Sequence, residues 1–212
     1  MKVLEFVIIG LAVSSFIIAG ASYPFMPDRM ASHWNVEGDV DGTMPPLSGS
    51  LIFPVLSVFL CGLFLVIPRI DPLRKNVKEF LVQYHRFVVL IMLFFMSVQL
   101  QVTLWNLGVE ISPNLVFPVG FGIMLFYAGT MMESSKRNYF IGIRTPWTLS
   151  DDRVWRGTHR VGGRLFKVCG VLSVAGFLFG VYSWLFIIAP VLTASVITIV
   201  YSYLLHRKLN PR

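Results

Sequence analysis

Long apolar runs separated by polar connections are the main pattern along this chain. Six runs are each close to the about 20 residues that a membrane-spanning helix needs. They cover residues 3–22, 51–68, 87–108, 115–132, 166–184 and 185–205. The first run is longer than a typical signal-peptide core, so we expect a retained helix. The pattern predicts an all-α polytopic membrane protein with six transmembrane helices.

Composition agrees with this prediction. Of the 212 residues, 55% are hydrophobic and 14% are charged, against about 25% charged in an average soluble domain. So few charges could hardly cover the surface of a soluble protein, which disfavours a soluble enzyme. High hydrophobicity also excludes a disordered chain. The net charge of +7 would suggest nucleic acid binding only if the protein were soluble.

The basic residues separate by side when the six runs alternate across a membrane. Of the 18 Lys and Arg residues, all except Arg29 fall at the termini or in the second and fourth connections. The positive-inside rule then places both termini in the cytoplasm and residues 23–50 outside. This predicts a multipass plasma-membrane protein whose basic excess reflects its orientation in the lipid bilayer, with no direct nucleic acid contact.

A short proline motif recurs in the second, fourth and sixth runs. The sequences Leu-Ile-Phe-Pro-Val, Leu-Val-Phe-Pro-Val and Ile-Ile-Ala-Pro-Val contain Pro54, Pro118 and Pro190. The motif indicates three repeated helical hairpins, or else prolines simply tolerated in first helical turns. We divide the chain into a first hairpin with its outward loop, residues 1–68, and a second region, residues 69–212, with a cytoplasmic loop at 133–165.

The outward loop combines turn-forming residues with an aromatic and polar cluster. Its candidate functional residues are Pro27, His33, Trp34, Asn35, Gly38, Asp41 and Gly42. Tryptophan prefers the membrane interface, so the loop is either a cap anchored over the helix ends or an outward recognition surface. The Asp-x-Asp-Gly segment lacks the Glu that completes a calcium loop, so we expect no metal here.

The cytoplasmic loop ends in a basic amphipathic segment. Thr148 and Asp151 resemble a capping box, with Ser150 as an alternative cap, so a helix is expected from there. On a helical wheel its cations form one stripe: Arg153, Arg156, Arg160, Arg164 and Lys167. We predict an interfacial helix leading into the fifth span, with Trp155 toward the membrane and the arginines toward lipid phosphates.

Catalytic chemistry is not indicated. Asp152 and His159 are two helical turns apart, about 10 Å, and cannot touch. No catalytic set, cofactor motif or metal-ligand spacing stands out, so we expect neither an enzyme nor a cofactor. His85 and His206 are expected at the interface. Polar Gln99, Gln101 and Asn106 are expected to form interhelical hydrogen bonds, and no charge at a span centre supports an ion-coupled transporter.

The cytoplasmic loop resembles the signature of the SdpI family. The matching positions are Asn138, Gly142, Arg144, Thr145, Pro146, Trp147, Thr148, Leu149, Trp155, Thr158, His159 and Gly162. The outward loop, from Pro27 through the His-Trp-Asn cluster to Gly42, resembles a membrane domain of unknown function that precedes this signature in such proteins. Together with the six runs, the resemblance covers nearly the whole chain.

The resemblance implies a function. SdpI-type proteins protect bacteria against a secreted killing peptide, and the founding member also captures an ArsR-type autorepressor at the membrane. It therefore implies a peptide toxin as the outward partner and a repressor as the inward partner of the signature residues. Two alternatives stay open: a small-molecule or lipid-handling transporter or enzyme that uses His33 and His159, and a purely structural subunit.

Overall fold

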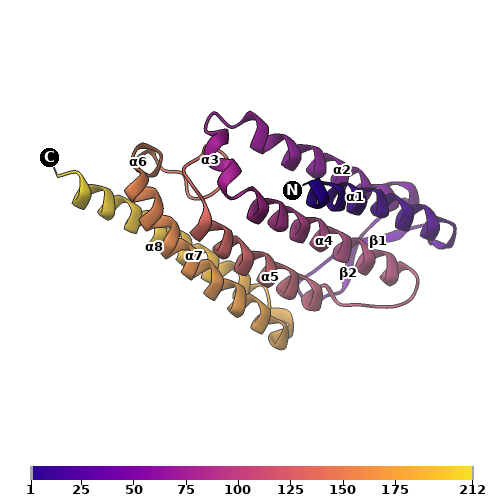
Figure 1. Ribbon diagram of the computed structural model, residues 1–212. Helices are drawn as coiled ribbons and strands as arrows, with labels where there is room; N and C mark the ends of the chain where they lie inside the picture. Colours follow the sequence, from indigo (N-terminus) through magenta and orange to yellow (C-terminus); the bar gives the residue numbers. More distant parts are fainter. Residues whose placement is uncertain (1, 212) are drawn as a thin grey trace.

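The computed structural model describes residues 2–211 and forms a bundle of six long helices (Figure 1). They are α1 (Lys2–Ser22), α2 (Pro46–Ile70), α4 (Leu81–Asn106), α5 (Pro113–Ser134), α7 (Asp152–Ala175) and α8 (Leu185–Leu209). The shorter helices are η1 (Tyr23–Phe25), α3 (Arg74–Glu79), α6 (Pro146–Ser150) and η2 (Gly176–Tyr182). Each long helix, with η1 and η2 continuing α1 and α7, is long and apolar enough to cross a membrane. The predicted all-α polytopic membrane class is confirmed.

The bundle has two distinct ends. Strands β1 (Met30–Trp34) and β2 (Val40–Met44) form an antiparallel hairpin at one end, which we call the hairpin end. The other end, the terminal end, carries α3, α6 and the C-terminus (Figure 1). Glu5 in the first turn of α1 is 3.5 Å from Arg69 near the end of α2, so the N-terminus also lies there. The hairpin was not predicted, because its residues do not alternate cleanly between polar and apolar.

Helices α4 and α5 are central, with α1 and α2 against α4 and with α7 and α8 on the α5 side (Figure 1). The tightest packing is between α5 and α7. Gly122 and Gly129 of α5 face Gly170 and Gly163 of α7, and a Cβ built on Gly170 would lie 2.6 Å from the Gly122 carbonyl oxygen. Such small residues allow two backbones to approach where larger side chains would separate them.

Buried polar groups connect elements as well. Ser15 of α1 donates to the Gln99 side chain of α4 at 2.5 Å, and the Gln99 amide donates to the Ser15 carbonyl at 2.8 Å. This confirms an interhelical bond for Gln99. Gln101 donates instead to the Ile111 carbonyl before α5, and Asn106 bonds β1 rather than a neighbouring long helix. The buried Gln101 amide and the half-buried Asn106 amide thus both have hydrogen-bond partners, as polar groups away from water require.

The three motif prolines lie inside α2, α5 and α8. First-turn tolerance therefore does not account for them, since Pro46 and Pro113 already occupy the first positions of α2 and α5. At Pro118 the Ser173 hydroxyl of α7 donates to the Pro118 carbonyl at 2.8 Å, which joins α7 to α5 at this level. The threefold hairpin repeat and the boundary between residues 68 and 69 stay predictions.

The predicted interfacial helix is not a separate element. The segment that begins at Asp152 is the first part of α7, which continues without a break to Ala175. Trp155, predicted to point toward the membrane, is instead buried at 1% exposure, and its indole donates to the Ser135 carbonyl at 3.1 Å. The amphipathic pattern therefore reflects packing of α7 on the chain's own core.

Candidate functional site: the two ends of the bundle

The hairpin presents a histidine–carboxylate pair to the exterior. His33 Nδ1 lies 2.5 Å from the Asp41 carboxylate, and the two side chains are 72% and 46% exposed. His33 pairs across the hairpin with Gly42, where a Cβ would lie 2.8 Å from the His33 Cβ. Gly42 is therefore required by close packing beneath the histidine. Pro27 is exposed between η1 and β1.

A tight turn closes the hairpin. The side-chain oxygen of Asn35 accepts the Asp39 backbone N–H at 2.8 Å, and the Asn35 backbone carbonyl accepts the Gly38 N–H at 3.1 Å. Gly38 has a φ of 93°, a conformation that glycine adopts without strain. The predicted turn residue Gly38 thus shapes the loop together with Asn35 of the His-Trp-Asn cluster, whereas Asp41 and Gly42, also predicted to favour a turn, lie in β2.

The hairpin is attached to the helix ends by several contacts. Asn106 of α4 accepts the Ala31 N–H at 2.8 Å and donates to the Ala31 carbonyl at 3.0 Å. Trp34 packs edge-to-face on Trp105, with ring centroids 5.4 Å apart. Beside it, a hollow of about 380 Å³ between the hairpin, α5 and α8 is lined mainly by apolar side chains. The loop is thus both an anchored cap and the wall of an open hollow.

At the terminal end, Asn138 organises the loop between α5 and α6. Its side chain is fully buried and bonds four backbone groups of this loop. The amide donates to the carbonyls of Lys136 and Ile141, and the side-chain oxygen accepts the N–H groups of Phe140 and Ile141. In a loop without helix or strand, the backbone N–H and C=O groups have few backbone partners. The buried side chain of Asn138 supplies hydrogen bonds to four of them instead.

His159 and Gly142 interlock below this loop. His159 is buried, and its ring stacks on that of Trp155 with the ring centroids 4.0 Å apart. Its Nδ1 lies 2.8 Å from the Trp155 carbonyl oxygen. Its Nε2 accepts the Ile143 N–H at 2.9 Å, so this network assigns the proton to Nδ1. Gly142 has a φ of 108°, and a Cβ there would collide with the His159 ring. Both ring nitrogens are occupied, which gives His159 a structural role.

The capping box lies three residues earlier than predicted. Thr145 and Thr148 form it reciprocally at the start of α6, with Pro146 in the first turn. Helix α7 instead has Asp151 as its N-cap, and the Asp151 carboxylate accepts the Arg153 N–H at 2.7 Å. The Thr148 and Asp151 pairing is therefore wrong, because the Thr148 hydroxyl is already used within α6.

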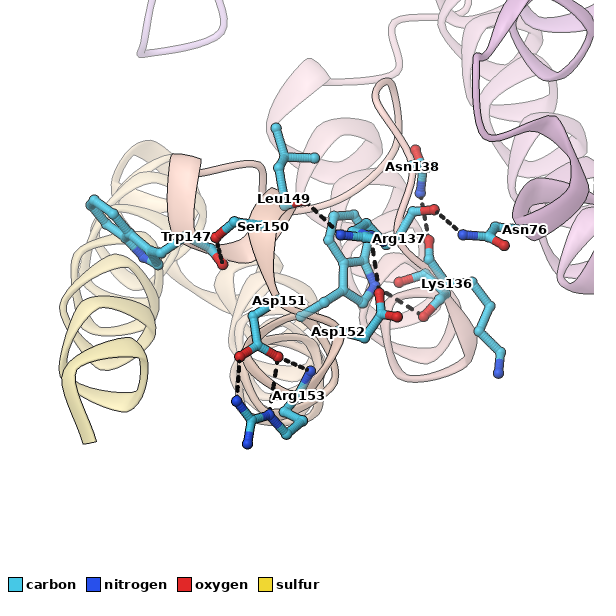
Figure 2. Close-up of polar contacts among 12 residues, drawn as sticks. Asn76, Lys136, Arg137, Asn138, Trp147, Leu149, Ser150, Asp151, Asp152 and Arg153 are labelled. Atoms are coloured by element: carbon cyan, nitrogen blue, oxygen red, sulfur yellow. Dashed lines mark hydrogen bonds and ion pairs between the residues drawn. The ribbon is translucent and has the colours of Figure 1, made fainter. Parts of the chain in front are cut away.

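Figure 2 shows the polar contacts that join α6 to the start of α7. Arg137 donates to the Leu149 carbonyl at 2.9 Å, and its Nε is 3.0 Å from Asp152 in an ion pair without hydrogen-bond geometry. The guanidinium of Arg153 bonds the Asp151 carboxylate at 2.8 Å and holds the pKa of Asp151 well below its usual range. Asp152 is thus paired with Arg137 and does not contact His159, as the seven-residue spacing between them predicted.

Trp147 attaches α6 to α8. Its indole donates to the Ser202 hydroxyl at 2.6 Å, and its ring packs edge-to-face on Tyr203. Arg144 is exposed, and its guanidinium donates to the Tyr139 carbonyl at 2.6 Å. Arg144 and Trp147 thus lie on the outer part of the loop.

Burial divides the signature residues into an inner and an outer set. The buried set is Asn138, Thr148, Trp155, Thr158, His159 and Gly162. The exposed or half-buried set is Gly142, Arg144, Thr145, Pro146, Trp147 and Leu149. The first set shapes the loop, as Gly142 and Thr145 of the second set also do, and the rest of the second set lies at or near the surface. His85, predicted at the interface, is likewise buried in α4.

Two residues outside the signature position its loop, and sequence reasoning missed both. Asp71, buried at the end of α2, accepts the Leu73 N–H at 2.6 Å and the Tyr139 N–H at 2.9 Å. Asn76 of α3 donates to the Arg137 carbonyl at 2.8 Å (Figure 2). The one sequence signal was a lone carboxylate directly after an apolar run.

We expect Asp71→Asn to loosen the loop. The asparagine side chain has one oxygen and one NH2 group. If its oxygen still accepts the Leu73 N–H, its NH2 group faces the Tyr139 N–H, which then has no acceptor. An unpaired buried N–H costs about 1–3 kcal/mol of stability. Hydrogen exchange should increase at residues 137–145 while α8 stays protected. Glu110→Gln, which changes an exposed carboxylate between α4 and α5 at the hairpin end, removes an equal charge and is the control. Unchanged exchange in Asp71→Asn would contradict this role.

These features define a class: a six-helix polytopic membrane protein with a β-hairpin at one end and an ordered basic loop at the other. Among residues 2–211, no three His, Cys, Asp or Glu side chains gather as metal ligands would. His33 and His159 lie at opposite ends of the bundle, so the structure does not bring them into one site.

Comparisons with known proteins show what this chain is similar to. Residues 134–202 match the SdpI/YfhL protein family, and residues 10–58 match a domain of unknown function, DUF1648. The chain is 29% identical to "Immunity protein SdpI" of Bacillus subtilis over 92% of each protein. It is 37% identical to "Uncharacterized membrane protein YbgB" of the same species over 23% of this chain and 54% of that protein. No solved structure matches. The predicted resemblance is confirmed: this is an SdpI-like membrane protein.

Proposed function

We propose that this protein gives immunity to a secreted peptide toxin and captures an ArsR-type repressor at the membrane. The observation that carries the proposal is the match to an immunity protein along 92% of both chains. Such coverage includes the hairpin and the signature loop alike, so the relative has a counterpart of both ends. The proposed activity needs no reaction at either end and makes the protein a non-enzymatic one.

The proposed orientation places the hairpin outside the plasma membrane and both termini in the cytoplasm. Its support is the charge distribution, since Arg29 beside β1 is the one basic residue of residues 2–211 near the hairpin. The other described cations flank helix ends at the terminal end or extend into the first turns of α7. Positive charge on short connections is retained in the cytoplasm.

Orientation can be tested by labelling single cysteines. Cys61 and Cys169 are buried and are first replaced by Ala. Asp39→Cys and Lys75→Cys then place one exposed thiol at the hairpin end and one on α3. We expect a membrane-impermeant maleimide to label Asp39→Cys in intact cells and Lys75→Cys only after permeabilisation. The reverse pattern would refute the orientation.

The immunity part of the proposal predicts protection of sensitive cells. Bacteria expressing the chain should survive secreted antimicrobial peptides that kill cells with an empty vector. Asp41→Asn weakens the exposed His33–Asp41 contact without touching the core, and we expect it to reduce survival. Asp28→Asn, an exposed carboxylate before β1, is the matched control and should protect fully. Equal survival with and without the chain across the peptide panel would contradict immunity.

The capture part predicts that the outer signature residues bind a repressor. A winged-helix repressor encoded beside the gene should sediment with membranes containing the protein when the peptide is present. Arg144→Ala removes an exposed guanidinium, so we expect a loss of capture by roughly tenfold. Trp147→Ala should act similarly, whereas Arg74→Ala on α3 should not. If both signature variants capture normally, the proposed role of the loop fails.

A further inference from the structure

Three arginines of α7 line a hollow that the proposed function does not use. Arg156, Arg160 and Arg164 follow one another at one-turn intervals of about 6 Å and are all exposed. The hollow, of about 370 Å³, lies between them and the end of α5. Its other lining residues are Glu133, Ser135 and His159. We propose that this arginine groove binds a phosphate group.

The groove carries positive charge without an internal partner. None of the three guanidinium groups forms an ion pair or a hydrogen bond within residues 2–211. Neighbouring cations differ: Arg153 pairs with Asp151, and Lys167 pairs with Glu133 at 2.6 Å. Like charges one turn apart on a helix repel each other, so a bound anion would relieve the repulsion.

The remaining lining residues favour an anion as well. Glu133 is already neutralised by its ion pair with Lys167. Both ring nitrogens of His159 are occupied by the backbone, so its buried ring is a neutral wall. The guanidinium groups are therefore the free donors of the groove, and their planar geometry suits the paired oxygens of phosphate.

The groove lies at the boundary between polar and apolar surface. One turn beyond Arg164, Val168 is 56% exposed, and Val171 after it is 60% exposed. Exposed valines at this depth indicate the apolar belt that contacts lipid tails. A phosphate at the level of the groove would thus come from an anionic phospholipid headgroup or from a soluble phosphate that reaches the membrane surface.

The test measures stabilisation of the purified full-length protein in detergent. A ligand that binds the folded state raises the melting temperature in a concentration-dependent way. Three titrations distinguish the sources: phosphatidylglycerol, phosphatidylcholine and inorganic phosphate, all at equal ionic strength. We expect R156Q/R160Q/R164Q to need roughly tenfold more of the effective ligand than wild type, because charge-assisted bonds are lost.

A matched variant separates the groove from general charge. R74Q/K75Q/K78Q removes three exposed cations from α3 at the same end of the bundle and should titrate as wild type does. R160Q alone, a milder change, should weaken the response several-fold even if the triple variant does not fold. A response to phosphatidylglycerol alone identifies the headgroup, and a response to inorganic phosphate identifies a soluble source; either supports the groove. Equal responses of the groove variants and wild type, or an equal loss in the α3 variant, would overturn it.

Discussion

Gly170→Ala is expected to destabilise the protein strongly, because the added methyl group would lie between the backbones of α5 and α7. The new Cβ would lie 2.6 Å from the Gly122 carbonyl oxygen and 2.7 Å from the Phe126 backbone nitrogen. Both neighbours are backbone atoms of α5, so no side-chain rotation can relieve the clash and the helices must move apart. We expect a loss of about 3 kcal/mol, at the upper end of the range for overpacked cores.

The matched control makes the same substitution where space is free. Gly62 in α2 has no atom within 4 Å of a built Cβ. Alanine favours a helix over glycine by about 1 kcal/mol, so Gly62→Ala should leave the melting temperature unchanged or raise it. Thermal unfolding in detergent, followed by tryptophan fluorescence, measures both. Similar curves for the two variants would show that the close approach of α5 and α7 does not exist.

Asn138→Ala is expected to unfold the signature loop while leaving the bundle assembled. The change removes four hydrogen bonds of 2.6–3.0 Å to the backbone of Lys136, Phe140 and Ile141. Each backbone group left unpaired in a buried place costs about 1–3 kcal/mol, although some of these groups would gain water. We expect a net loss of about 3 kcal/mol, confined to the loop.

Limited proteolysis and hydrogen exchange distinguish local from global loss. Cleavage between residues 136 and 150 should accelerate in Asn138→Ala, with little change in the melting of the long helices. Asn210→Ala, an exposed amide at the same end, is the control and should resist the protease as wild type does. A loop as protected as that of wild type would mean that Asn138 is not its organising residue.

If Asn138→Ala also abolishes repressor capture, the outer signature residues act only in the folded loop. Arg144 and Trp147 are spaced along the loop, and their relation in space depends on buried residues that touch no partner. The signature therefore combines two kinds of position, those that shape the loop and those that it presents. A variant of the first kind should lose order and capture together, and a variant of the second kind should lose capture alone.

The sequence alone determined the class, the number of spans and the resemblance to SdpI-type proteins. A helix must be about 20 apolar residues long to cross a bilayer, and this requirement can be read locally along the chain. The signature is equally local, because its residues all lie in one stretch, from 138 to 162. Helix ends were less well predicted: the second run was expected at 51–68, whereas α2 covers Pro46–Ile70. Hydropathy marks the apolar part of a helix, and the backbone continues beyond it.

Only the tertiary structure decided which residues meet. Tyr139 bonds Asp71, which is 68 positions away, and the glycines of α5 and α7 contact one another across a whole connecting loop. Trp155 was expected at the membrane because hydropathy cannot distinguish a lipid-facing indole from one buried against Ser135. Likewise, a helical wheel shows five cations on one stripe. The tertiary structure pairs Arg153 and Lys167 with carboxylates, and the other three arginines have no partner within residues 2–211. Hydrophobicity is a property of each residue, whereas burial and pairing depend on what the fold places opposite it.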